Sequence, residues 1–265
     1  MKIVITGSNG FIGSYLVKYY TEFGHNIIPL HRGVCDLEDA QSVKKFFNDN
    51  RCDVVIHAAL YGREQVHSED AQLYERNILM YENLVSNRDR FQKFINFGTG
   101  MEYDTQRDIK YADEDDIFYV EPAAFYARAK NTISRSMANY ESFYNLRLFG
   151  IAHYSEGNRF FNRLLTESQF TISEDREYDY FNLEDLPQVI DLVLDNKIKH
   201  KAINCVYEQK YKLSELAKLF CDIKGLDYNK VSITNNGQKN YTGDNAKLAS
   251  YNLPLLGIEL AMLRY

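Results

Sequence analysis

The sequence predicts an α/β fold in which a doubly wound parallel sheet is followed by a small C-terminal lobe. Segments typical of strands alternate with segments typical of helices through the first 150 residues, which favours parallel strands joined by helical crossovers. The chain opens with the apolar run Ile3-Val4-Ile5, and a glycine-rich turn and a helix-like segment follow it directly. A chain of 265 residues is long enough for one large domain with an attached lobe.

The elements of the first domain, residues 1–150, follow from this alternation. Strands are expected at residues 2–6, 26–30, 53–57, 94–97 and 145–149, and helices at residues 11–23, 39–48, 71–87 and 125–144. Residues 151–265 are expected to form a small substrate-binding lobe, with a segment at about residues 175–200 returning to the first domain. Within the lobe, residues 158–167 have the apolar spacing of an amphipathic helix. The acidic run at residues 113–116 is interpreted as a solvated loop, with a lid as the alternative.

Three glycines, Gly7, Gly10 and Gly13, follow the first strand at a spacing of three and three. Gly7 allows a tight turn, Gly10 lets the backbone approach a phosphate, and Gly13 lets the helix pack against the strand. The N-terminus of that helix offers unpaired N–H groups and the positive end of its dipole to a pyrophosphate. Because a strand precedes the turn and a helix follows it, the sequence predicts a dinucleotide site. An ordinary glycine-rich loop is the alternative.

A second motif places Tyr126 and Lys130 four residues apart, so that on a helix they share one face. A lysine ammonium beside a phenol favours the phenolate, and the pKa of Tyr126 is therefore expected to fall below its usual value of about 10. Such a tyrosine can exchange a proton with a sugar hydroxyl or a carbonyl. A pair at this spacing is common by chance in a chain with 21 tyrosines. Its position behind an N-terminal glycine turn is what favours a catalytic pair.

Together these motifs resemble the extended short-chain dehydrogenase/reductase family of nucleotide-sugar epimerases, dehydratases and reductases. The three-and-three glycine spacing is similar to the turn of that family, and the resemblance covers nearly the whole chain. Residues 94–103 resemble the strand that carries a catalytic Ser or Thr, which places that residue at Thr99, four before Tyr103. The resemblance therefore implies a Rossmann-type fold and a catalytic set of Thr99, Tyr126 and Lys130.

The resemblance also implies a cofactor site. Residues 56–59 resemble a strand end that lies over the cofactor, and Asn77 sits in a helix where the family places an asparagine. The implied cofactor-binding residues are Gly7, Asn9, Gly10, Phe11, Ile12, Gly13, His31, Arg32, Asp36, Leu37, Ala58, Ala59, Asn77, Tyr126, Lys130 and Phe149. In the lobe, Arg159 and Arg163 are candidates for contact with a substrate diphosphate, with an exposed helix face as the alternative.

The end of the second strand indicates which nicotinamide cofactor binds. In this fold an acidic residue there holds the ribose 2′-hydroxyl of NAD. Residues 29–32 contain no acid, and the guanidinium of Arg32 suits a 2′-phosphate and can stack on adenine. In related reductases a pair such as Asp36-Leu37 lies beside the adenine. NADP(H) is therefore favoured, and NAD(H) stays open because His31 tolerates either cofactor.

Departures from the family patterns limit which reactions the chain is expected to catalyse. The 4,6-dehydratases follow their threonine with Asp-Glu, where this chain has Gly100 and Met101. GDP-fucose synthases carry a cysteine at the position of Met101, and a thioether transfers no proton. Gly150 replaces an asparagine that is a common substrate contact. The expected function is therefore NADP(H)-dependent reduction of a nucleotide-linked 4-keto-6-deoxy sugar, with hydride transfer to C4 and Tyr126 as proton donor.

Two alternative functions stay open. An NAD-dependent nucleotide-sugar 4-epimerase uses the same three catalytic residues and retains its cofactor. A non-catalytic dinucleotide-binding regulator belongs to a different class, and it would be recognised by the loss of the catalytic Tyr or Lys. Both residues are present in this chain.

Composition limits the partners and the location. A net charge of −6 argues against non-specific binding of nucleic acid. The four cysteines and six histidines show no metal-ligand spacing, so reduced thiols and no metal are expected. The chain opens directly into a strand, which leaves no room for a signal peptide, and no apolar stretch approaches the ~18 residues of a membrane helix. We expect a cytoplasmic enzyme, compatible with a homodimer, that binds a nucleotide-sugar and neither nucleic acid nor a membrane.

Overall fold

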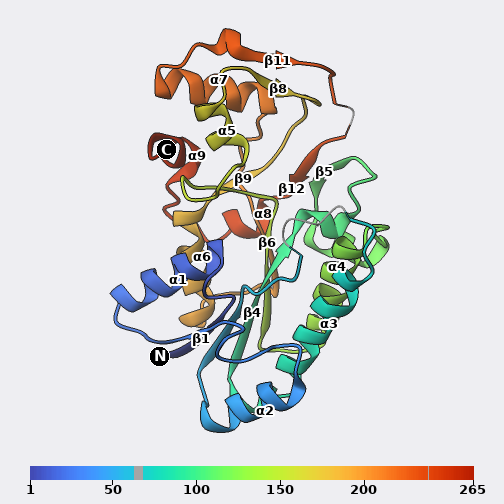
Figure 1. Ribbon diagram of the computed structural model, residues 1–265, viewed down its shortest axis with the longest axis vertical. Coiled ribbons are helices and arrows are strands. Elements are labelled where there is room, and N and C mark those ends of the chain that lie inside the picture. The colour runs from blue at the N-terminus through green and yellow to red at the C-terminus, as the bar shows by residue number, and fades with distance from the viewer. Residues whose placement is uncertain (63–67, 238) are drawn as a thin grey trace.

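Six parallel strands form the central sheet of the computed structural model, which describes residues 1–62, 68–237 and 239–265 (Figure 1). In sheet order they are β10 (Ala202–Cys205), β6 (Phe143–Leu148), β4 (Lys93–Thr99), β3 (Val54–His57), β1 (Lys2–Thr6) and β2 (Asn26–Leu30). Each neighbouring pair is parallel. The strand order reverses between β1 and β3, and at such a point a doubly wound sheet leaves a ligand crevice at its C-terminal edge. The predicted fold class is confirmed.

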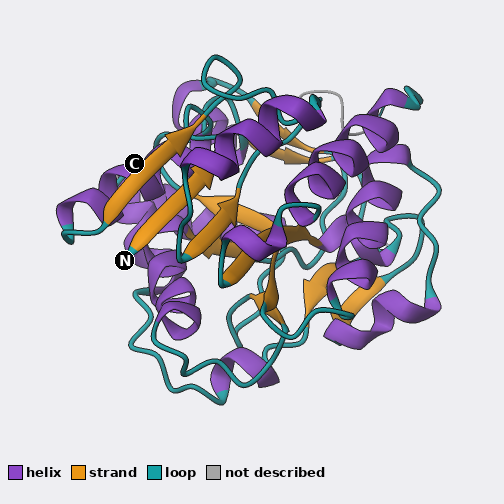
Figure 2. Cartoon of the chain, turned by 90° about the horizontal axis from the view of Figure 1, so that it is seen from below, coloured by secondary structure: helices purple, strands orange, loops and turns teal. Residues whose placement is uncertain are grey.

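Helices cover both faces of the sheet, as Figure 1 and Figure 2 show. One face is covered by α1 (Phe11–Glu22) and α6 (Leu186–Leu194), and the other by α2 (Ala40–Asp49), α3 (Gln72–Val85) and α4 (Phe125–Met137). Alternate residues of β1 show this layering, because Ile3 and Ile5 pack in the cluster with α1 and α6, whereas Val4 packs in the cluster with α2, α3 and α4. Burial on both faces explains why β1 is a continuous apolar run.

The C-terminal lobe lies beyond the C-terminal edge of the sheet, at the top of Figure 1. It is built from α5 (Phe160–Thr166), α7 (Leu213–Lys224), α9 (Gly257–Leu263) and the parallel strands β8 (Phe170–Ile172) and β11 (Val231–Ile233). The strands β7 (Gly150–Ala152) and β9 (Tyr180–Asn182) form a second parallel pair, and the short helix α8 (Ala246–Ala249) packs on β10. A third pair, β5 (Ile109–Ala112) with β12 (Tyr241–Gly243), joins the lobe to the first domain.

The segment that returns to the first domain reaches further than the expected range of about 175–200. It supplies α6 and then β10, which is the edge strand of the central sheet. Because β10 is short and contains Asn204 among apolar residues, its sequence carries no clear strand pattern.

The helix predicted at residues 125–144 is too long at its C-terminal end. Helix α4 ends at Met137, and β6 begins at Phe143. Phe143 pairs with Phe94 in the sheet, and the centres of their rings are 4.9 Å apart. Burial of Phe143 in the sheet core therefore overrides the local helix propensity of this segment.

The acidic run at residues 113–116 is more than the solvated loop that the sequence predicts, because Glu114 is buried. One oxygen of Glu114, Oε1, accepts a hydrogen bond from the Asn204 N–H at 2.7 Å. The other, Oε2, lies 3.2 Å from Lys247 Nζ. This carboxylate ties the edge strand β10 to the first domain, and burial raises its pKa.

Candidate active site

A cavity of about 860 Å³ opens where β1, β3, β4 and β6 end and the lobe begins. Its volume is in the range of sites that hold small molecules and cofactors. Its lining includes the predicted residues Gly7, Asn9, Gly10, Phe11, Ile12, His31, Arg32, Asp36, Leu37, Ala58, Ala59, Thr99, Tyr126, Lys130 and Phe149. Of the predicted cofactor residues, Gly13 and Asn77 do not line it.

The glycines of the turn after β1 let neighbouring backbone segments approach one another closely. Gly7 has a φ of +63°, and a Cβ on it would lie 2.6 Å from the carbonyl oxygen of Ala58. A Cβ on Gly13 would lie 2.2 Å from the carbonyl oxygen of Gly7. The Gly10 N–H closes the turn by donating to the same Gly7 oxygen at 2.8 Å. Because the N-terminus of α1 opens on the cavity at Asn9 and Gly10, these residues fit a dinucleotide pyrophosphate.

Behind this turn, the end of β3 is fixed by a buried pair. Thr6 Oγ1 lies 2.8 Å from His57 Nδ1 and accepts a hydrogen bond from the Ala59 N–H at 3.2 Å. Burial lowers the pKa of His57 to about 3, so its imidazole is neutral at neutral pH. The pair therefore holds the Ala58-Ala59 backbone at the cavity wall without adding charge.

Asn77 supports the cavity wall from outside the lining. Its Oδ1 accepts the Tyr61 N–H at 3.0 Å, and its Nδ2 donates to the carbonyl oxygens of Tyr61 and Leu73. Tyr61 lines the cavity. The asparagine thus positions the loop after β3, and its direct contact with a cofactor stays a prediction.

The rim at the end of β2 carries ion pairs that the sequence did not indicate. Arg32 is 61% exposed and pairs with Glu38, which also pairs with Arg76 of α3 at 2.7 Å. The Arg76 guanidinium lies 3.7 Å from the centre of the Tyr61 ring. Glu38 and Arg76 are 38 positions apart, and no spacing rule reveals such a contact. Arg32 is thus held at the cavity rim by a carboxylate that a bound phosphate could replace.

The three predicted catalytic residues meet in the cavity. Thr99 lies at the end of β4, and Tyr126 and Lys130 come from successive turns of α4. All three are buried, with exposed fractions of 9%, 7% and 6%. Lys130 Nζ donates to the carbonyl oxygen of Phe97 at 2.9 Å, which fixes α4 against β4.

The expectation that Lys130 lowers the pKa of Tyr126 is wrong for this structure. Burial raises the pKa of Tyr126 above its usual value, and the charge of Glu102 adds to the increase. Thr99 and the charge of Arg159 act in the opposite direction, but burial outweighs them. Burial also lowers the pKa of Lys130 to about 8. Tyr126 is therefore protonated at neutral pH, which is the form that donates a proton.

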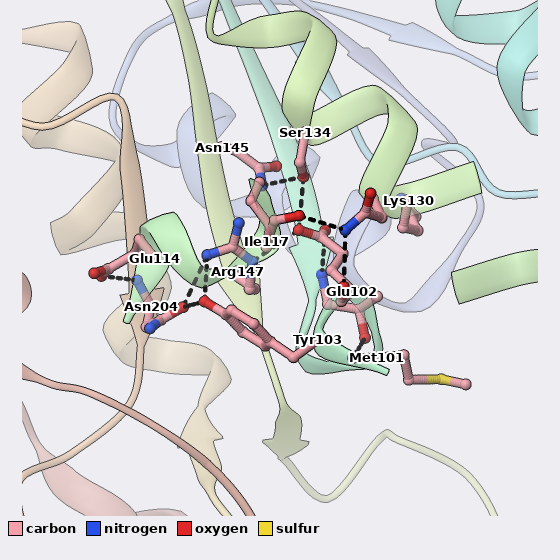
Figure 3. A network of polar contacts seen from close by, with 12 residues as sticks. Met101, Glu102, Tyr103, Glu114, Ile117, Lys130, Ser134, Asn145, Arg147 and Asn204 are labelled. Carbon is pink, nitrogen blue, oxygen red and sulfur yellow. Dashed lines mark hydrogen bonds and ion pairs between the residues drawn. The ribbon is translucent and has the colours of Figure 1, made fainter. Parts of the chain in front are cut away.

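A buried polar network centres on Glu102 and Arg147 (Figure 3). Glu102 Oε1 accepts the Thr99 N–H at 2.9 Å, while Oε2 accepts Arg147 Nε at 2.8 Å and Ser134 Oγ at 2.7 Å. The Glu102 and Arg147 side chains are both fully buried. Arg147 Nη1 continues the network to the Tyr103 hydroxyl at 2.7 Å. Because both Glu102 oxygens are hydrogen-bonded, this carboxylate positions Thr99 and is not free to act as a base.

The lobe brings cations to the same cavity. Arg159, at the start of α5, and Arg176, which the sequence analysis missed, both line it. Arg163 does not, because it pairs with Glu167 at 2.8 Å on the helix surface. Of the two arginines predicted to contact substrate, the structure therefore places only Arg159 in the cavity.

Aromatic side chains complete the wall. A Cβ on Gly100 would lie 2.3 Å from the Phe149 ring, and one on Gly243 would lie 2.8 Å from it. Gly100 thus allows Phe149 to pack against the end of β4. Tyr241, from β12 of the lobe, also lines the cavity, and its Oη lies 3.5 Å from Thr99 Oγ1.

The described part of the chain contains no group of three or more His, Cys, Asp or Glu side chains able to hold a metal ion. Cys35, Cys52, Cys205 and Cys221 are free and buried. Among the described helices, none is long and apolar enough to cross a membrane.

The fold and the site define an NAD(P)-dependent enzyme. A model of the NAD dependent epimerase/dehydratase family matches residues 3–205, and the chain belongs to this family. Protein CapI of Staphylococcus aureus is 24% identical over 226 residues, which are 73% of this chain and 67% of CapI. A dTDP-4-dehydrorhamnose reductase of Mycolicibacterium smegmatis is 37% identical over 60 residues, which are 23% of this chain and only 18% of that reductase.

Solved structures of similar fold cover almost the whole chain. The GDP-mannoheptose C4 reductase of Campylobacter jejuni with NADP bound has a TM-score of 0.83 and 20% identity, over 99% of this chain and 96% of that one. A dTDP-4-dehydrorhamnose reductase of Clostridium acetobutylicum has a TM-score of 0.82 and 20% identity, over 100% and 98%. The Thermus thermophilus UDP-glucose 4-epimerase in complex with NAD has a TM-score of 0.80 and 20% identity, over 99% and 97%. At these identities the likeness shows the fold alone.

Proposed function

We propose that this protein is an NADP(H)-dependent reductase that transfers hydride to C4 of a nucleotide-linked 4-keto-6-deoxy sugar. One observation carries the proposal: Thr99, Tyr126 and Lys130 line the same cavity as the glycine turn and the lobe arginines. A dinucleotide held at the turn and an anionic sugar nucleotide held by the lobe would meet at these three residues. The reductases among the solved structures of similar fold support the same class of reaction.

Each residue has a defined task in this reaction. Bound NADPH would supply the hydride. The turn at Gly7 and Gly10 would hold the pyrophosphate, and Lys130 would hold the adjacent ribose. Tyr126, protonated because it is buried, would donate its proton to the oxygen at C4. The Thr99 hydroxyl would hydrogen-bond the same oxygen as negative charge develops on it.

Residues near Thr99 favour reduction over dehydration. Loss of water from a sugar needs an acid and a base beside the hydride-transfer set. Gly100 and Met101 can neither gain nor lose a proton, and Glu102 is buried with both oxygens hydrogen-bonded. The two positions directly after Thr99 therefore offer no carboxylate for elimination.

The lobe arginines suit an anionic substrate. Arg176 Nε is buried and has no hydrogen-bond partner among the described residues. Buried donors without a partner are costly, so a substrate oxygen would supply what this guanidinium lacks. Arg159 also lines the cavity, and its charge lowers the pKa of Tyr126, which supports a role in binding the anionic substrate.

Arg32→Ala should weaken binding of NADPH about ten- to hundredfold and leave NADH almost unchanged. Only NADPH carries the 2′-phosphate, and losing a charge-assisted hydrogen bond costs about 1.5–3 kcal/mol. Titration of the protein with each cofactor, followed by nicotinamide fluorescence, measures both constants. Lys45→Ala removes an exposed cation outside the cavity lining and serves as the matched control. Equal losses for both cofactors would show that Arg32 only supports the rim through Glu38.

A nucleotide-sugar 4-epimerase is the second candidate. A UDP-glucose 4-epimerase of Neisseria meningitidis is 28% identical over 102 residues, which are 29% of this chain and 30% of that enzyme. Both reactions use the same three residues, and they differ in the fate of the cofactor.

An assay with NADPH and a panel of nucleotide-linked 4-keto sugars separates the two candidates. For a reductase, NADPH absorbance should fall in proportion to the substrate consumed. An unchanged absorbance together with release of an unreduced epimer, or a tightly retained NAD in the purified protein, would support the epimerase instead.

A further inference from the structure

Tyr241 is a buried phenol beside Thr99 in the cavity, and the proposed reaction assigns it no role. It lies outside residues 3–205, the part that the family model matches. Pairing of β12 with β5 brings it there, with Tyr241 opposite Ile109. Its ring packs against those of Phe149 and Tyr178, at centre-to-centre distances of 5.0 and 4.9 Å, and the side chain is only 5% exposed.

The Tyr241 hydroxyl contacts Thr99 and no other described side chain by a hydrogen bond. Its Oη lies 3.5 Å from Thr99 Oγ1. The same Thr99 oxygen accepts the Met101 N–H at 3.3 Å. Both distances are long, as is common for catalytic hydrogen bonds before substrate binds.

The direction of this hydrogen bond follows from the chemistry of the two hydroxyls. Burial raises the pKa of Tyr241 well above its usual value, so the phenol keeps its proton and can donate it. A threonine hydroxyl has two acceptor positions and one hydrogen. With Met101 N–H and Tyr241 O–H on the two acceptor positions, the hydrogen of Thr99 must point elsewhere. Tyr126 lines the same cavity, and Thr99 acts on its pKa.

We propose that Tyr241 is a positioning residue for the hydride-transfer site: it donates to Thr99 and thereby turns the single Thr99 hydrogen toward the substrate carbonyl. This inference rests on the proposed function. It adds a residue of the lobe to a catalytic set that otherwise comes from β4 and α4. The orientation of Thr99 then depends on the contact between the lobe and the first domain.

A double-mutant cycle tests the proposal. Tyr241→Phe removes one oxygen and keeps the ring against Phe149, so kcat should fall roughly five- to tenfold, the effect of one net hydrogen bond. In a Thr99→Val background the same change should lower kcat less than about twofold, because the partner is gone. KM for NADPH should not change in either background. Tyr180→Phe, at a tyrosine of the lobe outside the cavity lining, should leave kcat unchanged.

The four proteins of the cycle (wild type, Tyr241→Phe, Thr99→Val and the double variant) are also unfolded in urea without substrate. A coupling between Tyr241→Phe and Thr99→Val in the unfolding equilibrium, roughly five- to tenfold, should report the hydrogen bond itself. Absence of coupling in urea, or an equal loss of kcat in both backgrounds, would overturn the proposal. If the wild-type protein reduces no keto sugar but interconverts epimers, the proposed function fails, and kcat of the four proteins is then measured for epimerisation. If the protein neither reduces a keto sugar nor interconverts epimers, the urea experiment alone tests the inference, and absence of coupling overturns it.

Discussion

Tyr126→Phe should lower kcat by about 10²–10⁴, the usual effect of removing a positioned general acid. The substitution removes one oxygen from a buried ring, so the fold and the affinity for NADPH should be retained. Steady-state kinetics with a nucleotide-linked 4-keto sugar measure the loss, while cofactor titration and thermal unfolding measure what is retained.

Tyr81→Phe is the matched control for this substitution. Tyr81 is also buried, and its hydroxyl bonds to Ser136 in the last turn of α4; neither residue lines the cavity. We expect its kcat to equal that of the wild type. A Tyr126→Phe enzyme with nearly normal turnover would mean that another group supplies the proton.

Arg147→Met should lower the free energy of unfolding by about 3–5 kcal/mol, the usual effect of leaving one buried charge unpaired. Glu102 would lose the partner at 2.8 Å and remain fully buried beside Thr99. Urea denaturation followed by circular dichroism measures the change. Because Glu102 also accepts the Thr99 N–H, kcat should fall as well.

Two further variants make this test specific. In the double variant Arg147→Met/Glu102→Gln the unpaired charge is gone while an amide oxygen can still accept the Thr99 N–H, so much of the stability should return. Arg163→Met breaks the partly exposed pair with Glu167, and it should cost less than about 1 kcal/mol. A loss of similar size in Arg147→Met and Arg163→Met would contradict the role assigned to the network.

The first half of the fold could be predicted because its signals are local. The apolar runs that become β1 and β3 are buried on both faces of the sheet. The glycine spacing after β1 reports steric limits that act within a few residues, as the 2.2 Å approach of a Gly13 Cβ to Gly7 shows. Thr99, Tyr126 and Lys130 were found because the family motif fixes them, and the structure brings them into one cavity.

The features that could not be predicted depend on contacts between distant segments. The Glu102–Arg147 pair spans 45 positions, and the contact between Thr99 and Tyr241 spans 142. No periodicity or spacing connects such residues, because the sheet and the lobe bring them together only after folding. The pKa of Tyr126 differs from the prediction for the same reason: the spacing of four indicates an effect of Lys130, whereas burial, which depends on the folded chain, dominates.

Transfer of an isotope label tests the central claim most directly. The enzyme is incubated with NADPH carrying deuterium at the transferable C4 position of the nicotinamide and with a nucleotide-linked 4-keto-6-deoxy sugar. NADPH labelled on one face of C4 and NADPH labelled on the other face are used in separate reactions. For one of them, the released sugar should carry one deuterium at C4, detected by NMR and mass spectrometry, with one NADP⁺ formed per product. A turned-over sugar without deuterium at C4 in both reactions, or a product formed without net oxidation of NADPH, would contradict the assignment as a reductase.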